Sequence, residues 1–171
     1  AMALAHLSGA TDEEIKQGMA SFRGVDRRFD FKIKTSRLVF LSDYAHHPAE
    51  IAQSVKSVRE LYKDKKITAI FQPHLYTRTR DFYKDFADSL SLLDEVILTE
   101  IYPAREQPIP GVSSRLIYDN LRPGIEKCIC PKEDILNLLS KKSVEVLIVL
   151  GAGDLDNYVP SITQLLEQQS K

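Results

Sequence analysis

Apolar residues recur along the chain with two different spacings. Between residues 29 and 35 they alternate with charged side chains, and this period of two predicts a half-buried β-strand. Short, nearly continuous apolar runs predict more deeply buried strands at 37–42, 67–71, 95–99, 127–130 and 144–150. Apolar positions three or four residues apart predict helices at 49–62, 81–93, 113–120, 133–139 and 159–169.

The order of these elements indicates the fold class. Strands alternate with helices along most of the chain, which is typical of βαβ units. We therefore expect an α/β domain with a mostly parallel sheet of about six strands, flanked by helices. In open sheets of this kind, ligands bind beyond the carboxyl ends of the strands. The residues that directly follow each apolar strand are therefore the first candidates for function.

A separate helix is predicted ahead of the first strand. Thr11 and Glu14 have the spacing of a capping box, in which each side chain bonds the other residue's backbone N–H. An apolar stripe follows, formed by Ile15, Met19 and Phe22. The candidate domain boundary lies near Gly24, where this helix gives way to Arg27 and Arg28. Residues 1–7 are small and apolar and resemble the end of another helix.

Composition and charge narrow the function classes. The 171 residues carry a formal net charge of −1, which argues against a dedicated nucleic-acid binder and against a polybasic membrane-surface protein. The longest strongly apolar run, 144–150, is far shorter than the roughly 20 residues that a membrane-spanning helix needs. Cys128 and Cys130 alternate within one predicted strand, so we expect buried free thiols in a reducing, cytoplasmic compartment.

One cluster of polar side chains follows the second predicted strand. It reads Asp43-Tyr44-Ala45-His46-His47-Pro48, and Pro48 can open the next helix at its first position. Substrate contact is the favoured interpretation. A purely structural role remains open, with Asp43 forming the turn and one histidine acting as a donor. Zinc is a weaker alternative, because a third spaced ligand is not evident.

A second cluster follows the strand at 67–71. It reads Gln72-Pro73-His74-Leu75-Tyr76-Thr77-Arg78-Thr79-Arg80-Asp81. Arg78 and Arg80, just before the helix predicted from residue 81, can hold a phosphate or carboxylate with forked hydrogen bonds. The alternative is a surface helix on which these arginines pair with Asp81 or Asp85. We favour anion binding because the position at a strand end is right.

Other signals are weaker alone. The doubled Arg27-Arg28 is commonly just solvated, and the turn 151–154 (Gly-Ala-Gly-Asp) lacks the third glycine of a dinucleotide fingerprint. The sequence contains no G-x-x-x-x-G-K-[ST] phosphate loop and no G-x-S-x-G motif. If the chain serves an ATP-dependent enzyme, another segment must therefore hold the triphosphate and its magnesium ion.

Several segments together resemble a known family. They are Phe22-Arg23-Gly24-Val25-Asp26-Arg27-Arg28-Phe29, the 43–48 cluster, Phe71 to Thr79 and the 151–154 turn, in order and in register. Together they resemble the C-terminal domain of the Mur ligases. The stretch 102–109 (Tyr-Pro-Ala-Arg-Glu-Gln-Pro-Ile) is similar too. The His46-His47 pair is shared with the murein-tripeptide recycling ligases, whereas the 71–79 segment points to the members that use L-alanine.

The resemblance implies a fold, an activity and partners. It implies a three-layer, Rossmann-like lid over residues 23–171, with residues 1–22 as the helical tail of a central ATPase domain. The implied activity is ATP-dependent joining of L-alanine to UDP-N-acetylmuramate through an acyl phosphate. ATP and Mg²⁺ would be held mainly by the central domain, so we expect this chain alone to be inactive. A murein-tripeptide ligase and a stand-alone anion- or nucleotide-binding module remain the alternatives.

The resemblance also implies roles for individual residues. Arg28 would reach the ATP phosphates and Asp43 the ribose hydroxyls. The residues expected to face the amino acid or the acyl phosphate are Tyr44, His46, His74 and Arg78, of which the last three are the catalytic candidates. Leu75 stands where the family usually has arginine, and Arg80 is the nearest possible replacement. No metal ligand is implied within this chain.

Overall fold

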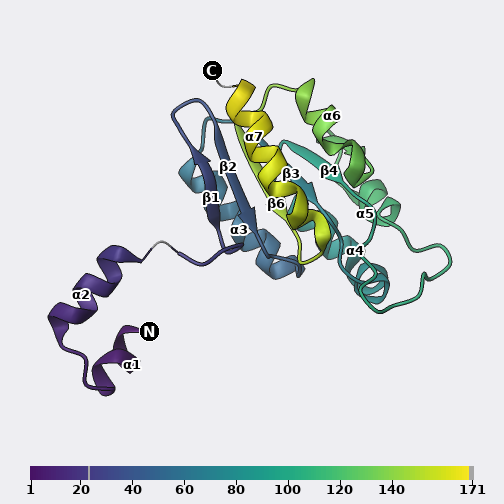
Figure 1. Ribbon diagram of the computed structural model, residues 1–171. Helices are drawn as coiled ribbons and strands as arrows, with labels where there is room; N and C mark the ends of the chain where they lie inside the picture. The colour runs from purple at the N-terminus through teal and green to yellow at the C-terminus, as the bar shows by residue number, and fades with distance from the viewer. Residues whose placement is uncertain (23, 170–171) are drawn as a thin grey trace.

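The computed structural model describes residues 1–22 and 24–169. Arg23, where the predicted C-terminal domain begins, lies outside the described residues. The centre is one six-stranded sheet in the order β1-β2-β6-β3-β4-β5 (Figure 1). Every neighbouring pair is parallel except β1 with β2. The strands are β1 Asp30–Lys34, β2 Val39–Asp43, β3 Ile67–Phe71, β4 Glu95–Leu98, β5 Glu126–Ile129 and β6 Val146–Leu150.

Helices cover both faces of this sheet, which confirms the predicted α/β class. Buried residues of α3, α4 and α5 pack on one face, and those of α6 and α7 pack on the other (Figure 1). The helices are α1 Met2–Leu7, α2 Asp12–Ser21, α3 Pro48–Leu61, α4 Tyr76–Leu90, α5 Arg115–Asn120, α6 Ile135–Ser140 and α7 Val159–Gln169. Two short 3₁₀ turns precede α6 and α7, at Lys132–Asp134 and Asp154–Tyr158.

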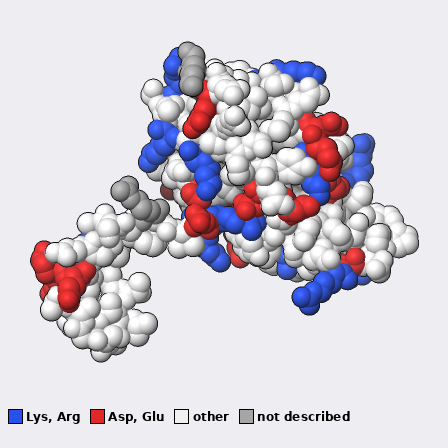
Figure 2. All heavy atoms as spheres, viewed as in Figure 1, with Lys and Arg blue, Asp and Glu red and all other residues white. Residues whose placement is uncertain are grey.

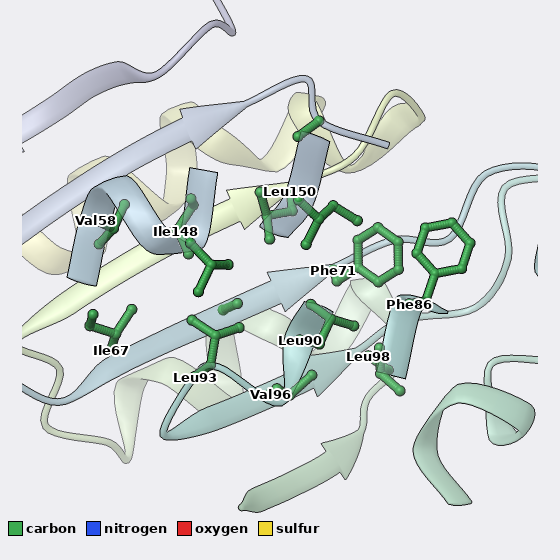
Figure 3. Packing of buried hydrophobic residues seen from close by; sticks show 14 of the residues in the cluster. Val58, Ile67, Phe71, Phe86, Leu90, Leu93, Val96, Leu98, Ile148 and Leu150 are labelled. Carbon is green, nitrogen blue, oxygen red and sulfur yellow. The ribbon is translucent and has the colours of Figure 1, made fainter. Parts of the chain in front are cut away.

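Alternate residues of the central strands enter separate cores. In β3, Phe71 faces the α3–α4 side with Phe86, whereas Ile70 faces the α6–α7 side. β6 repeats the pattern, because Ile148 and Leu150 lie in the first core while Leu147 and Val149 lie in the second. Figure 3 shows the first core, where side chains of α3 and α4 pack onto β3, β4 and β6. This period-two division explains why β6 is apolar at every position and β3 at every position except Thr68.

The start of α4 differs from the sequence prediction. Apolar spacing placed the helix from residue 81, but α4 begins at Tyr76 and carries Arg78 and Arg80 in its first turns. Phe82 has non-helical torsions (φ −122°, ψ 15°) that divide the element at a kink. The periodic pattern therefore marked only the segment after the kink. The polar turn before it is held by contacts with another loop, described below.

Strand register brings the two polar clusters to one edge of the sheet. Asp43 at the end of β2 and Phe71 at the end of β3 both pair with Leu150, the last residue of β6. The three parallel strands thus end at the same level. The turns that follow them, which begin near Tyr44, Gln72 and Gly151, therefore emerge side by side.

The N-terminal helices bury nothing within the described chain. The predicted Thr11–Glu14 capping box at the start of α2 is confirmed. Neither α1 nor α2 contains a buried residue, and the large exposed apolar side chains in them and directly after α2 are Met2, Leu4, Leu7, Met19 and Phe22. Figure 1 shows both helices apart from the sheet. An apolar helix surface of this kind is typical of a segment that packs against further protein.

Surface charge and helix length are the two features that relate to nucleic-acid and membrane binding. Acidic and basic side chains are interspersed over the sheet domain in Figure 2, and a small acidic cluster from Asp12, Glu13 and Glu14 lies on α2. Within the described ranges, no helix combines the length and apolar character needed to cross a bilayer.

Candidate functional site

Asp43 ends β2 with its carboxylate held in a fixed orientation. One oxygen accepts a hydrogen bond from the backbone N–H of Ala45 at 3.2 Å, and the other accepts one from the hydroxyl of Ser54 in α3. The side chain is only partly buried. Asp43 therefore forms the turn, as the structural interpretation expected, and still presents a preoriented carboxylate at the sheet edge.

The two adjacent histidines point to different neighbours. Glu50 accepts hydrogen bonds from the backbone N–H groups of His46 (3.0 Å) and His47 (3.2 Å), which fixes the start of α3. His46 then turns inward, with its ring 5.1 Å from that of Tyr44 and its Nδ1 2.9 Å from the Tyr44 carbonyl. His47 packs against Phe82, at 5.3 Å between ring centroids. Only His46 joins the cluster at the sheet edge.

His74 lies at the centre of this cluster. Its ring stacks on Tyr102 at 5.6 Å and meets His46 edge-on at 5.9 Å. Burial, Arg78 and His46 lower the pKa of His74 against the opposing charge of Glu106. The imidazole is therefore neutral at pH 7. Its Nδ1 is buried and has no hydrogen-bond partner among the described residues.

Arg78 and Arg80 separate, although both were candidates for anion binding. Residues two apart on a helix point roughly 200° apart. Arg80 accordingly faces outward, where its Nε lies 2.7 Å from Asp81 Oδ1. Arg78 lies close enough to His74 for its charge to lower the pKa of that histidine, and its Nη1 is buried without a partner within residues 1–22 and 24–169. The surface-helix interpretation is thus correct for Arg80, which does not replace the missing family arginine at Leu75.

The doubled arginine also divides into two environments. Arg28 is exposed, with its guanidinium carbon 5.9 Å from the Tyr44 ring centroid. Arg27 lies closer to the ring, at 4.8 Å, and its Nε pairs with Asp156 at 3.1 Å. Arg27 Nη2 also reaches the carbonyl oxygen of Gly151 at 3.4 Å. Arg27 thus connects the segment before β1 to the edge of the sheet. Arg28 faces solvent at the same edge.

The glycine turn after β6 packs against protein. A Cβ on Gly153 would lie 2.3 Å from Gln72 Oε1 and 2.8 Å from Tyr102 Cβ. The Gln72 amide holds the turn, because its Oε1 accepts from Leu155 N (3.0 Å) and its Nε2 donates to Asp154 (2.8 Å). These glycines therefore allow close approach to Gln72 and Tyr102, and the turn is a support for the site.

The structure thus gathers the predicted residues at the carboxyl ends of β2 and β3. Tyr44, His46 and His74 form a continuous run of ring contacts, Arg78 adds a half-buried guanidinium, and Arg28 and Asp43 flank the run. His74 Nδ1 and Arg78 Nη1 are buried in this region without a hydrogen-bond partner among the described residues. Buried polar atoms are rarely left unpaired in proteins, so this pair is suited to a carboxylate or phosphate ligand.

Three contributors were missed at the level of sequence: Arg27, Tyr102 and Glu106. The only signal for the last two was the 102–109 segment, which follows a strand end. No group of three or more His, Cys, Asp or Glu side chains placed to hold a metal ion occurs among the described residues.

Comparison with known proteins identifies relatives of this chain. A family model described as Mur ligase, glutamate ligase domain, matches residues 27–155. A UDP-N-acetylmuramate–L-alanine ligase from Phocaeicola vulgatus is 78% identical over 169 residues, which cover 99% of this chain and 37% of the relative. The enzyme of the same name from Parabacteroides distasonis is 55% identical, with 99% and 36% covered. The chain thus spans a little over a third of these relatives.

Solved structures agree on the fold. A UDP-N-acetylmuramate-alanine ligase from Thermotoga maritima superposes with a TM-score of 0.76 at 29% identity, over 99% of this chain and 36% of that one. A murein peptide ligase from Psychrobacter arcticus gives a TM-score of 0.67 at 17% identity, over 96% and 35%. The second likeness concerns the fold alone.

Proposed function

The chain belongs to the Mur ligase family, and from this membership we propose that it is the C-terminal domain of a ligase that joins L-alanine to UDP-N-acetylmuramate. The reaction uses ATP and supplies peptidoglycan precursors in the cytoplasm. The observation that carries the proposal is that His74 Nδ1 and Arg78 Nη1 are buried at the sheet edge with no hydrogen-bond partner in the part of the chain that the structure describes. The 78% identity to a ligase of that name supports the choice of amino acid.

Arg78 and His74 are the residues that would bind L-alanine and assist its attack. ATP would phosphorylate the lactyl carboxylate of UDP-N-acetylmuramate, and the amine of L-alanine would displace phosphate from that acyl phosphate. Arg78 binds the alanine carboxylate with a charge-assisted hydrogen bond. The neutral imidazole of His74 can accept a proton from the attacking amine, and His46 and Tyr44 hold that imidazole in place. Preorganised donors at this edge stabilise the anionic transition states.

The nucleotide side falls to Arg28 and Asp43. The exposed guanidinium of Arg28 can reach phosphate oxygens, and the fixed carboxylate of Asp43 can accept hydrogen bonds from ribose hydroxyls. The described residues offer no set of metal ligands, so the Mg²⁺ of the reaction would be held by the remainder of the ligase. The exposed apolar faces of α1 and α2 support their assignment to the preceding ATPase domain.

Changing Asp43 to asparagine in the full-length ligase should raise the KM for ATP about tenfold. The variant loses a charge-assisted acceptor while keeping an oxygen of the same shape. Steady-state kinetics with varied ATP measure the effect, and the KM for L-alanine should change little. Asp26→Asn, an exposed position at the same entry segment, is the matched control. An unchanged KM for ATP would remove Asp43 from the nucleotide site.

Substrate choice by the full-length gene product tests the proposed function. We expect ATP-dependent product with L-alanine and none with a preformed tripeptide. The opposite preference would assign the chain to the recycling ligases. Anion binding without any turnover would instead support a stand-alone module.

The 171-residue chain alone should show no alanine-dependent phosphate release above a buffer blank, because its sequence contains no phosphate loop. A phosphate-release assay with ATP, Mg²⁺ and both substrates measures this. Turnover by the isolated chain would contradict the division of labour between this domain and the rest of the ligase.

A further inference from the structure

Glu106 caps helix α4 from a different loop. The residue at the N-cap of α4, Leu75, offers no side-chain hydrogen bond, so the first N–H groups of the helix need other acceptors. Glu106 Oε2 accepts from the backbone N–H of Thr77 at 2.9 Å, and Oε1 accepts from the Thr77 hydroxyl. A carboxylate at this end also interacts favourably with the helix dipole. The first turn of α4, which carries Arg78, is thus fixed by a residue 29 positions later.

The loop that contains Tyr102 and Glu106 also forms backbone hydrogen bonds to the residues on both sides of His74. Tyr102 N donates to the Pro73 carbonyl at 2.8 Å, and its own carbonyl accepts from Leu75 N at 2.9 Å. The Tyr102 ring stacks on His74 between these two bonds. Glu106 N closes a turn onto the Pro103 carbonyl at 2.9 Å, which sets the distance from Tyr102 to the helix cap. The loop therefore contacts the turn before α4 and the helix itself.

The turn that the loop holds is a strained one. Leu75 has φ +74°, a backbone conformation that a leucine rarely adopts. Such a residue is strained and persists only where its surroundings hold it in place. Tyr102 bonds to Pro73 and to the N–H of Leu75 itself, and Glu106 bonds to Thr77 two residues after Leu75. Without them the turn would relax, and His74 and Arg78 would lose their common direction.

From these contacts we infer that Glu106 is a positioning residue of the ligation reaction: it holds the first turn of α4 so that Arg78 and His74 face the same anionic substrate. Both Glu106 carboxylate oxygens are bonded to Thr77, so the residue acts through the helix without touching substrate. Hydrogen bonds from Thr77 lower the pKa of Glu106, which keeps the cap ionised at neutral pH. The inference rests on the proposed function for the identity of that substrate, L-alanine.

Kinetics of the full-length ligase test this role. Glu106→Ala should raise the KM for L-alanine about tenfold, since small misplacements of binding groups have effects of this order or larger. The KM values for ATP and UDP-N-acetylmuramate should stay within about twofold. Glu106→Gln should recover most of the loss, because its amide oxygen can still accept from Thr77 N. Gln107→Ala, the exposed neighbour, is the matched control.

A double-mutant cycle separates positioning from direct contact. Thr77→Val should raise the KM for L-alanine by a smaller factor, and combining it with Glu106→Ala should add nothing to the Glu106→Ala effect. Additive effects, or an unchanged KM in Glu106→Ala, would overturn the inference. So would a Glu106→Gln variant as impaired as Glu106→Ala.

Amide exchange keeps this test distinct from the proposed function. In the 171-residue chain, Glu106→Ala should speed hydrogen exchange of the Thr77 amide at least tenfold, and Gln107→Ala should leave it unchanged. If wild-type ligase does not use L-alanine, the proposed function fails while this measurement still decides whether Glu106 holds the helix. If Glu106→Ala does not fold, Glu106→Gln and Thr77→Val carry the same comparison. If Glu106→Ala leaves hydrogen exchange of the Thr77 amide unchanged, Glu106 does not hold the start of α4.

Discussion

Replacing Arg78 with alanine in the full-length ligase should raise the KM for L-alanine about 100-fold while the KM for ATP changes little. Arg78 is half-buried, and its Nη1 is buried without a hydrogen-bond partner among the described residues, so a substrate carboxylate can supply that partner. A hydrogen bond to a charged group contributes about 1.5–3 kcal/mol, and the upper part of that range corresponds to a change of about 100-fold. Initial rates at varied L-alanine and saturating ATP measure the effect.

Two further variants make the Arg78 result specific. Arg80→Ala removes the same side chain two residues on, where it faces outward against Asp81, and should leave the KM for L-alanine unchanged. Arg78→Lys should recover little, because an ammonium lacks the planar fork of donors. Equal effects of Arg78→Ala and Arg80→Ala would show that general loss of positive charge, and not the geometry at Arg78, governs alanine binding.

The second large effect concerns stability. Glu95, 4% exposed at the start of β4, accepts hydrogen bonds from Thr68 (3.1 Å), Lys66 and Lys142. Glu95→Ala would leave two lysines without their shared carboxylate. Breaking a buried ion pair costs about 3–5 kcal/mol, and the partial exposure of both lysines reduces this to about 2–3 kcal/mol. Urea unfolding of the 171-residue chain measures the loss in free energy of unfolding.

The ion pairs of Glu95 should also make the free energy of unfolding depend on pH. Burial raises the pKa of Glu95, but hydrogen bonds from Lys142 and Lys66 outweigh it and hold the pKa below its usual value. A carboxyl with a lowered folded pKa stabilises the protein above its unfolded pKa, and this contribution disappears as pH falls below about 4.3. The wild type should therefore lose more stability than Glu95→Ala on acidification. Glu126→Gln, an exposed partner of Lys66, should resemble wild type.

Sequence periodicity predicted the central elements because burial decides them. Every residue of β3 and β6 is buried, and the predicted run 67–71 matches β3 at both ends. The start of α4 was missed for the opposite reason. Tyr76 to Arg80 carry no apolar stripe, and their helical form depends on the cap from Glu106, which is 29 residues away from Thr77 in sequence.

The residues of the candidate site could likewise be predicted only in part. Position after the strand ends predicted the 43–48 and 72–81 clusters as candidate sites, and the family resemblance singled out Asp43, His46, His74 and Arg78 within them. Spacing alone could not separate Arg78 from Arg80, because that choice depends on where α4 begins. Arg27 was likewise hidden, since its partners Gly151 and Asp156 become neighbours only when β6 pairs with β2.

A crystal structure of the full-length ligase with a nonhydrolysable ATP analogue, UDP-N-acetylmuramate and L-alanine would test the central claim most directly. We expect the alanine carboxylate within hydrogen-bond distance of Arg78 Nη1, with the amine on the His74 side and the nucleotide ribose at Asp43. An alanine held elsewhere, with Arg78 Nη1 and His74 Nδ1 still unpartnered, would contradict the assignment of this sheet edge as the amino-acid site.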